Sequence, residues 1–384
     1  MSILEECKKI ENDLIYYYQE LHQIPEIGFD VEKTINFIKN EIEKMDLEPI
    51  SYGKNGLYVD LGSGEPKTIF RADVDGLRIK EETKLGFKAT NGNMHACGHD
   101  MHSSILLGSI KILKNKMFNG TIRFVFQPAE ESLEGAKDLI ENKVLKDMDR
   151  AFMLHVNTNT SFDTGTVIIP KGGTITPYAE NISICLSGKS AHGGYPHLGI
   201  DLFLVESLIL MGLKNIKASE LSLNEKSLIS FGNLHSGNNY NVIPDTLIMD
   251  GMIRSFDKKV HNFVLDRANS IVKHISKAFN VKSKFIINNS IKAFVNDETL
   301  RLETMDILKK ELPNVYLDTS SPSSAGTEDF SEISQLVPTN MFLLCAGKTE
   351  DGFSYPLHHP KCVFDVNAMV YGVCLFVSLG VLLK

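Results

Sequence analysis

The chain has 384 residues, more than a single hydrophobic core usually organises, so two domains are expected. Hydrophobic residues make up 43% and charged residues 23% of the chain, and the formal net charge is -8, so it lacks the basic character of a nucleic-acid-binding protein. Six scattered cysteines without a disulfide-framework spacing, and an N-terminus without a signal-peptide pattern, predict a cytoplasmic protein.

The first half of the chain alternates helical and strand patterns. Apolar spacing predicts helices over Leu4–His22 and Val31–Met45, on either side of the turn QIPEIGF. Short apolar runs then predict strands, the last two over Gly120–Phe126 and Arg150–His155, with a helix expected from His102 to Lys116. A further helix is expected to start near Ser132. This alternation predicts an α/β domain with a mostly parallel sheet.

Acidic and imidazole side chains follow the predicted strands at the points where the strands end. They are Asp73, Glu130, Glu131 and His155. In a parallel sheet, ligands collect beyond the carboxyl ends of the strands, so these side chains are expected to meet at one crevice.

The pattern changes after about Pro177. Strands are predicted at 181–186, 227–233, 246–253 and 284–287, with helices at 201–213 and 257–279. This order, β-α-β-β-α-β, predicts an inserted ferredoxin-like α+β domain over 180–292, within a catalytic domain formed by 1–179 and 293–384.

The first pattern resumes in the last third of the chain. It comprises a helix over Asp297–Leu312, the loop SSPSSAGTEDF at 320–330, a strand and a terminal helix over Val366–Leu383. The terminal helix carries polar residues and is barely long enough to span a bilayer, so a buried helix is predicted and no membrane partner is expected.

The stretch MHACGHDMH, at 94–102, holds the donor types that a zinc-like metal ion prefers. Cys97, His99, His95 and His102 supply thiolate and imidazole groups within nine residues. Glu130 and Glu131 are either an ordinary acidic helix start or a pair in which one residue binds metal and the other transfers protons. One of His358 and His359 is expected to be a further ligand, as is His155.

These residues carry a resemblance that spans essentially the whole chain. LHQIPEIGF, RADVDGL, MHACGHDMH, FQPAEE, LHVN, GKSAHGGYPHLGID, NVIPD, GMIRSF, GTEDF and LHHP occur in this order. The chain thereby resembles the M20 metallopeptidases, in particular their amidohydrolase branch of hippurate hydrolases, N-acyl-amino-acid deacylases and indole-acetyl-amino-acid hydrolases.

The resemblance implies a metal-dependent hydrolase of N-acyl-L-amino acids with a small-molecule substrate and a site for two divalent metal ions (Zn, or Mn, Co or Ni). The implied metal ligands are Cys97, His99, Glu131, His155 and His358, with Cys97 bridging the two ions. Glu130 is the implied general base and His192 the implied oxyanion donor from the inserted lid domain. Asn241 and Arg254 are the implied ligands of the substrate carboxylate. A homodimer through the inserted domain is also implied, while Asp73, Asp75, His95 and His102 are expected to support the ligands.

Two loops depart from the family pattern. Ser132–Glu134 interrupt the glycine run that usually follows FQPAEE, and Lys361 and Cys362 follow LHHP. Three alternatives remain open at this point: a dipeptidase or aminopeptidase of the same family, a catalytically inactive ligand-binding relative, and a hydrolase with Cys97 as nucleophile. The acyl group, the amino acid and the native metal are not determined by the sequence.

Overall fold

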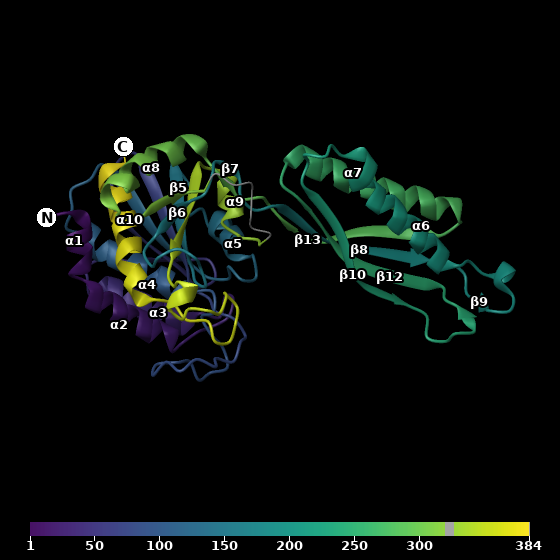
Figure 1. Cartoon of the computed structure of the whole chain (residues 1–384), viewed down its shortest axis with the longest axis horizontal. Helices are drawn as coiled ribbons and strands as arrows, with labels where there is room; N and C mark the ends of the chain where they lie inside the picture. The colour runs from purple at the N-terminus through teal and green to yellow at the C-terminus, as the bar shows by residue number, and fades with distance from the viewer. Residues whose placement is uncertain (319–325, 384) are drawn as a thin grey trace. The chain divides into compact units, whose positions relative to one another are not determined.

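The computed structural model describes residues 1–318 and 326–383 (Figure 1). It divides into two compact units by the density of internal contacts. Unit 1 contains Met1–Gly173 and most of the chain from Val295 onward, and unit 2 contains Thr174–Phe294. The predicted loop at 320–330 lies largely outside the described residues.

Unit 1 is built on an eight-stranded sheet. In spatial order its strands are β1 (Ile50–Tyr52), β2 (Gly56–Ser63), β4 (Gly120–Gln127), β3 (Lys67–Asp73), β5 (Arg150–Asn157), β16 (Thr339–Cys345), β6 (Val167–Ile169) and β15 (Val315–Leu317). The central strands β4, β3, β5 and β16 are all parallel, and antiparallel pairs occur only towards the edges. The predicted α/β class with a mostly parallel sheet is therefore confirmed.

Helices cover both faces of this sheet. Figure 1 shows α4 and α10 on one side, with α1 and α2 outside them, and α5 and α9 on the other side. The helices of unit 1 are α1 (Ile3–Lys8), α2 (Glu11–His22), α3 (Glu32–Glu43), α4 (His99–Leu113), α5 (Gly135–Glu141), α8 (Glu298–Glu311), α9 (Ser331–Ser334) and α10 (Met369–Leu382).

Several helix predictions in unit 1 were wrong in detail. The helix expected from His102 to Lys116 is α4, which spans His99–Leu113. The single helix expected over Leu4–His22 is divided into α1 and α2, because α1 packs against α10 whereas α2 packs against α4. The helix expected near Ser132 begins only at Gly135, because Leu133 adopts a left-handed conformation with φ of 60° and closes a turn onto the Glu130 carbonyl.

The terminal helix α10 is buried along most of its length, with Val373, Leu375 and Val377 fully inside the core of unit 1. Among the described residues, no helix combines the length and apolar character that crossing a membrane requires. The prediction of a buried terminal helix agrees with this packing.

Unit 2 has a four-stranded antiparallel sheet in the order β10-β12-β8-β13. Its elements are β8 (Tyr178–Ser187), α6 (Leu202–Asn215), β10 (Ser227–Ser236), β12 (Thr246–Ser255), α7 (Lys258–Ala278) and β13 (Lys282–Ile291). The two helices pack on one face of the sheet over an apolar core that includes Ile184, Ile209 and Val264. This is the ferredoxin-like arrangement predicted from the β-α-β-β-α-β order.

A candidate metal centre

The parallel strands of unit 1 deliver polar side chains to one edge of the sheet. Asp73 ends β3, the pair Glu130–Glu131 follows β4, and His155 lies near the end of β5. His358 lies in the segment after β16, and Cys97 and His99 lie where the connection from β3 enters α4. Because parallel strands end at the same edge, residues up to about 260 positions apart come together there.

The structure brings the predicted metal ligands into one cluster centred on Cys97. The Cys97 Sγ atom lies 3.5 Å from His155 Nε2 and 3.3 Å from His358 Nε2. Glu131 Oε1 lies 3.5 Å from His358 Nε2 and 3.9 Å from His99 Nε2. Cys97 belongs both to a group with His99 and His155 and to a group with Glu131 and His358, in each of which the ligand atoms lie within 4.8 Å of one another.

Two atoms of this cluster are buried and have no hydrogen-bond partner within residues 1–318 and 326–383: His99 Nε2 and Glu131 Oε1. A buried polar atom without a partner is unfavourable by a few kcal/mol, and a bound cation removes that penalty. Thiolate, imidazole and carboxylate together are the donor set of zinc and similar divalent ions. The residues present therefore fit a divalent metal centre.

In both His99 and His155, the Nδ1 atom is hydrogen-bonded to a backbone carbonyl. His99 Nδ1 donates to the Asp75 carbonyl at 2.8 Å, and His155 Nδ1 donates to the Val156 carbonyl at 2.7 Å. These hydrogen bonds fix the tautomer, so the Nε2 lone pairs of His99 and His155 point into the cluster. Such outer contacts are typical of metal-binding histidines.

The other two histidines of MHACGHDMH do not contribute ligand atoms. His102 Nδ1 donates to Asp73 Oδ1 at 2.5 Å, and its Nε2 accepts from the Val156 amide at 2.8 Å, so both nitrogens are used. His95 is buried, and it belongs to none of the groups in which metal-binding atoms of the described residues lie within 4.8 Å of one another. Burial lowers the pKa of each of these two histidines to about 4, so both are neutral.

Glu130 lies beside the cluster, with Oε2 3.8 Å from His99 Nε2. The Asp75 carboxylate accepts hydrogen bonds from the backbone amides of Glu130 and Glu131, at 3.1 and 3.2 Å. These bonds fix the turn that carries both glutamate side chains. Burial, together with the nearby Glu328 carboxylate, raises the pKa of Glu130 well above its ordinary value. A buried acid with a raised pKa next to metal-binding groups is suited to proton transfer.

A buried arginine that the sequence analysis did not single out supports this edge of the sheet. Arg71 on β3 donates to Asp73 Oδ2 at 2.8 Å and to Asp329 Oδ1 at 2.8 Å, and lies 3.3 Å from Glu328 Oε1. Gln127 also donates to Asp329. In the sequence, the motifs RADVDGL and GTEDF each carry charged residues next to apolar ones. The sequence does not show that Arg71 of the first motif pairs with Asp329 of the second, because this pairing depends on tertiary structure.

The predicted substrate-binding residues of unit 2 do not come together within one chain. His192 on β9 (Ala191–His192) pairs with β11 (Val242–Ile243), and the Asn241 carbonyl accepts from the amide of Gly193 at 2.7 Å. These residues adjoin the Thr246 end of β12, whereas Arg254 lies near its other end. At ~3.3 Å per residue the two ends are roughly 26 Å apart, too far for a single substrate carboxylate.

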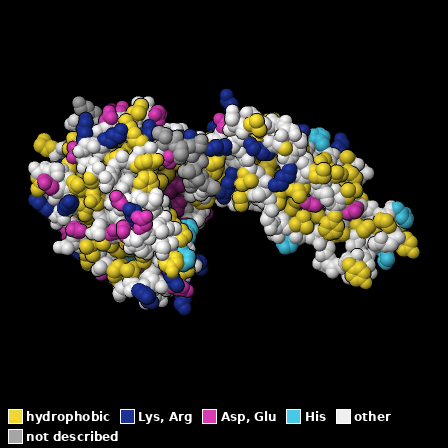
Figure 2. Space-filling view, in the orientation of Figure 1, with side chains coloured by type: hydrophobic (Ala, Val, Ile, Leu, Met, Phe, Trp, Pro, Cys, Tyr) yellow, Lys and Arg dark blue, Asp and Glu magenta, His cyan; other side chains and the backbone are white. Residues whose placement is uncertain are grey.

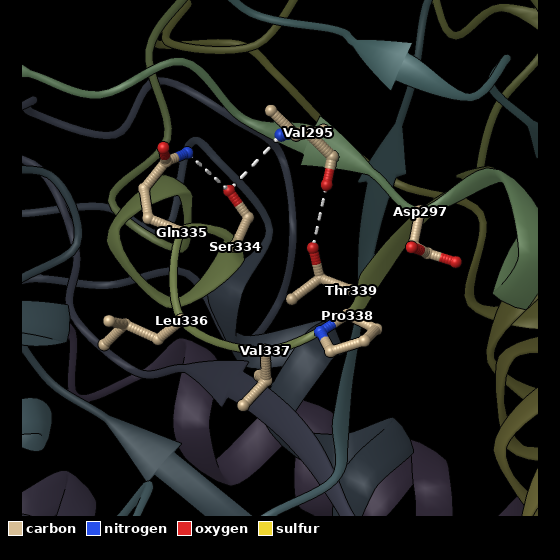
Figure 3. A pocket seen from close by; sticks show the side chains of 8 residues that line it. All are labelled: Val295, Asp297, Ser334, Gln335, Leu336, Val337, Pro338 and Thr339. Atoms are coloured by element: carbon tan, nitrogen blue, oxygen red, sulfur yellow. Dashed lines mark hydrogen bonds between the residues drawn. The ribbon is translucent and has the colours of Figure 1, made fainter.

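A shallow pocket elsewhere in unit 1 lacks comparable chemistry (Figure 3). It is lined by Val295, Asp297 and the residues from Ser334 to Thr339. Its one carboxylate, Asp297, caps α8 by accepting from the Leu300 amide at 2.8 Å. The pocket therefore offers no unused acid, base or metal ligand.

The two loops that depart from the family pattern each come shortly after a proposed ligand in the sequence, one after Glu131 and the other after His358. The Ser132–Glu134 segment forms the turn before α5. After His358, Cys362 is 1% exposed, packs into the core of unit 1 and belongs to none of the possible metal-binding groups among the described residues. All six cysteines are unpaired by disulfides, as predicted.

An α/β unit with clustered metal-binding side chains and a buried acid at its strand ends defines a metal-dependent hydrolase. The family model described as peptidase family M20/M25/M40 matches residues 69–380. The chain belongs to this family, as predicted from its motifs.

Individual relatives cover nearly the whole chain. An N-acetyl-L-cysteine deacetylase of Bacillus subtilis (strain 168) is 32% identical over 368 residues, covering 94% of this chain and 86% of the relative. Thermostable carboxypeptidase 1 of Saccharolobus solfataricus is 32% identical over 397 residues, covering 99% of both chains. The crystal structure of a dinuclear metal binding M20 peptidase from Bacillus subtilis has a TM-score of 0.83 at 26% identity, covering 97% of this chain and 98% of that one.

Proposed function

We propose that this protein hydrolyses the amide bond of N-acyl-L-amino acids, releasing a carboxylic acid and the free amino acid. Two divalent metal ions are held by Cys97, His99, Glu131, His155 and His358. The observation that carries the proposal is the buried cluster around Cys97, with Glu130 alongside. In it, His99 Nε2 and Glu131 Oε1 have no hydrogen-bond partner in the part of the chain that the structure describes.

In this mechanism, the bound metal ions supply polarisation of the amide carbonyl and a lowered pKa of water. Glu130 removes a proton from the attacking water as its oxygen bonds to the carbonyl carbon. The raised pKa of Glu130 favours its holding of that proton. Glu130 then transfers the proton to the amide nitrogen as the carbon–nitrogen bond breaks, so the amino acid leaves as a neutral amine.

The alternative with Cys97 as nucleophile is disfavoured by the environment of its thiol. Burial raises the pKa of Cys97 well above its ordinary value. A thiol in such surroundings becomes a thiolate when a strong positive charge adjoins it, and two divalent ions provide that charge. Chelator-treated protein that retained full activity would support the nucleophile and contradict the metal centre.

The leaving group is proposed to be an amino acid with a free α-carboxylate. The names of two relatives fit such a substrate. A deacetylase removes the acetyl group from an N-acetyl amino acid, and a carboxypeptidase releases a C-terminal amino acid, so both names describe cleavage of an amide bond. Arg254 is proposed to bind the carboxylate, since its planar fork matches two carboxylate oxygens, with Asn241 as a second polar contact. His192 is proposed to donate to the carbonyl oxygen as it becomes negative.

We further propose a homodimer through unit 2, in which His192 and Asn241 of one chain and Arg254 of the other serve one active site. The roughly 26 Å between the ends of β12 supports this division. The outer side of α6 also exposes apolar residues, with Phe203 45%, Leu204 50% and Met211 69% accessible. Figure 2 shows hydrophobic side chains on the surface of unit 2. Exposed apolar area of this kind marks an interface.

The dimer is tested by Met211→Glu, which places a charge in the proposed interface. Sedimentation velocity is expected to show a monomer for this variant and a dimer for both the wild type and Asn262→Glu, a change on the exposed side of α7. A dimeric Met211→Glu protein would contradict this interface.

The activity is tested on metal-reconstituted protein with two substrate sets: N-acetyl and N-benzoyl derivatives of several amino acids, and dipeptides with the same C-terminal residues. Hydrolysis of the acyl derivatives in preference to dipeptides is expected. Glu130→Gln is expected to retain two metal ions per chain and to lose about 10²- to 10⁴-fold in kcat, the usual contribution of a general base. Two bound metals without turnover of any substrate would favour a ligand-binding relative.

A further inference from the structure

The N-terminal motif LHQIPEIGF has no part in the proposed chemistry, yet its histidine is buried next to the metal centre. His22 is the last residue of α2 and is 2% exposed. Its Nδ1 atom lies 2.6 Å from Asp100 Oδ2, and its Nε2 atom lies 3.2 Å from Glu81 Oε1. Tyr18 and Phe87 pack against the ring.

The two carboxylates belong to different parts of the site. Asp100 directly follows His99 in the first turn of α4. Glu81 belongs to the loop after β3, where its second oxygen accepts from the Ala89 amide at 2.7 Å. The next residue, Glu82, donates its amide to the Pro360 carbonyl at 2.8 Å, two residues after His358. His22 therefore connects the start of α4 with the loop that carries His358.

The same segment supports the remaining ligand loops through its backbone. The Glu26 carbonyl accepts from the Gly76 amide at 2.6 Å, one residue after Asp75. The Gly28 carbonyl accepts from the Ala129 amide at 3.0 Å, immediately before Glu130. Residues 22–28 thus contact the loops after β3 and β4 as well as α4.

We propose that His22 is a positioning residue of the metal centre, which holds the His99 and His358 sides of the site at their binding distance by bridging Asp100 and Glu81. This inference rests on the proposed metal-dependent function. Both ring nitrogens face carboxylate oxygens, which accept hydrogen bonds, so the geometry favours the imidazolium form with hydrogen on both nitrogens. The bridge is a buried cation between two buried anions.

Loss of the cation leaves Asp100 and Glu81 as buried like charges without a counter-charge. Such charges repel and draw in water, which separates the two elements that they hold. Replacing His22 changes none of the proposed metal ligands, so its loss should weaken metal binding rather than abolish it. Changes to groups that orient metal ligands typically weaken affinity by about 10- to 100-fold.

The test compares His22→Gln with His261→Gln. His261 is the matched control, because it is a 3% exposed histidine with Nε2 3.1 Å from Glu180 Oε1, and it belongs to unit 2, which contains none of the proposed metal ligands. Zinc affinity is measured by chelator competition, and the ligand geometry by the visible spectrum of the cobalt(II) protein. Unfolding of the metal-free proteins is measured in parallel.

His22→Gln is expected to bind zinc about 10- to 100-fold more weakly and to give an altered cobalt spectrum. His261→Gln is expected to lose folding stability while keeping wild-type affinity and spectrum. Wild-type affinity and spectrum in His22→Gln would overturn the inference, even if its stability falls. If His22→Gln does not fold, Glu81→Gln provides the same comparison, because it keeps the side-chain size and removes one charge of the bridge.

The outcome for the wild type separates this inference from the proposed function. A wild-type protein that binds no zinc contradicts the proposed metal centre itself. A wild-type protein that binds two zinc ions, together with a His22→Gln variant that binds them equally well, contradicts only the role of His22.

Discussion

Gly98 lies between the proposed ligands Cys97 and His99, and its replacement by alanine tests how tightly the metal stretch is packed. Its φ of 85° is in the left-handed region. A Cβ atom there would lie 2.3 Å from Val156 Cγ2 and 3.0 Å from Phe364 Cζ. Both neighbours are buried, so neither moves away without displacing other core atoms.

The expected loss of unfolding free energy has two parts. The left-handed conformation disfavours an L-residue by roughly 1–2 kcal/mol. Forcing an extra carbon into the packed contact with Val156 adds about 1–3 kcal/mol. Gly98→Ala should therefore destabilise unit 1 by roughly 2–5 kcal/mol, and it should also weaken zinc binding because the ligands on both sides are displaced.

The measurement is urea unfolding of the chelator-treated protein, which removes the contribution of metal binding to stability. Gly64→Ala is the control, because its φ of 87° is nearly the same but no atom lies within 4 Å of a Cβ there. It should lose only about 1–2 kcal/mol. In the double variant Gly98→Ala/Val156→Ala the smaller side chain relieves the contact, so the two changes should be less than additive. An equal loss for Gly98→Ala and Gly64→Ala would refute the packing argument.

Three further predictions concern charged groups. For His22, burial alone lowers the pKa, but the hydrogen bonds to Asp100 and Glu81 outweigh it and raise the pKa from 6.5 to about 9. The bridge therefore contributes its full stability below pH 6.5 and loses it as the pH rises through 9, so the difference in unfolding free energy between wild type and His22→Gln should fall by roughly 3 kcal/mol from pH 6 to pH 10. A pH-independent difference would contradict the ionised bridge. Arg71→Met should lower the unfolding free energy by about 3–5 kcal/mol, because it leaves buried carboxylates without a counter-charge. Arg71→Lys should recover only part of this loss, since lysine lacks the planar fork of arginine. Full recovery by lysine in urea unfolding would show that charge alone suffices. Asp257→Ala removes the side chain that accepts the first amides of α7, at 2.8 and 3.0 Å, and should destabilise unit 2 by about 1 kcal/mol in thermal unfolding; an unchanged melting temperature would mean that the cap does not stabilise the unit.

The class of fold followed from local patterns. Apolar spacing and the order of elements predicted both the parallel α/β layer and the β-α-β-β-α-β insertion. This works because a helix or strand that buries one face repeats its apolar residues with a characteristic period. Boundaries were less accurate. β10 and β13 extend beyond the predicted strands, and β10 contains a bulge between Phe231 and Asn233, whose position depends on the neighbouring strand.

The candidate site was predicted unevenly for a physical reason. The residue types of MHACGHDMH and the position of Glu130 after a strand indicated metal-assisted hydrolysis. The burial of Arg71 between Asp73 and Asp329 depends on tertiary structure, because Asp329 is 258 residues away in the chain.

The sequence by itself determined the donor types, the family and the order of the secondary-structure elements, because these depend on residue identity and short-range periodicity. Only the tertiary structure decided which imidazole nitrogens are available. His102 is excluded because Asp73 and the Val156 amide use both of its nitrogens, whereas His99 Nε2 has no hydrogen-bond partner among the residues that the structure describes. The role of His22 was likewise decided by folding, because its two carboxylate partners are 59 and 78 residues away in the chain and meet it only when α2 packs against α4.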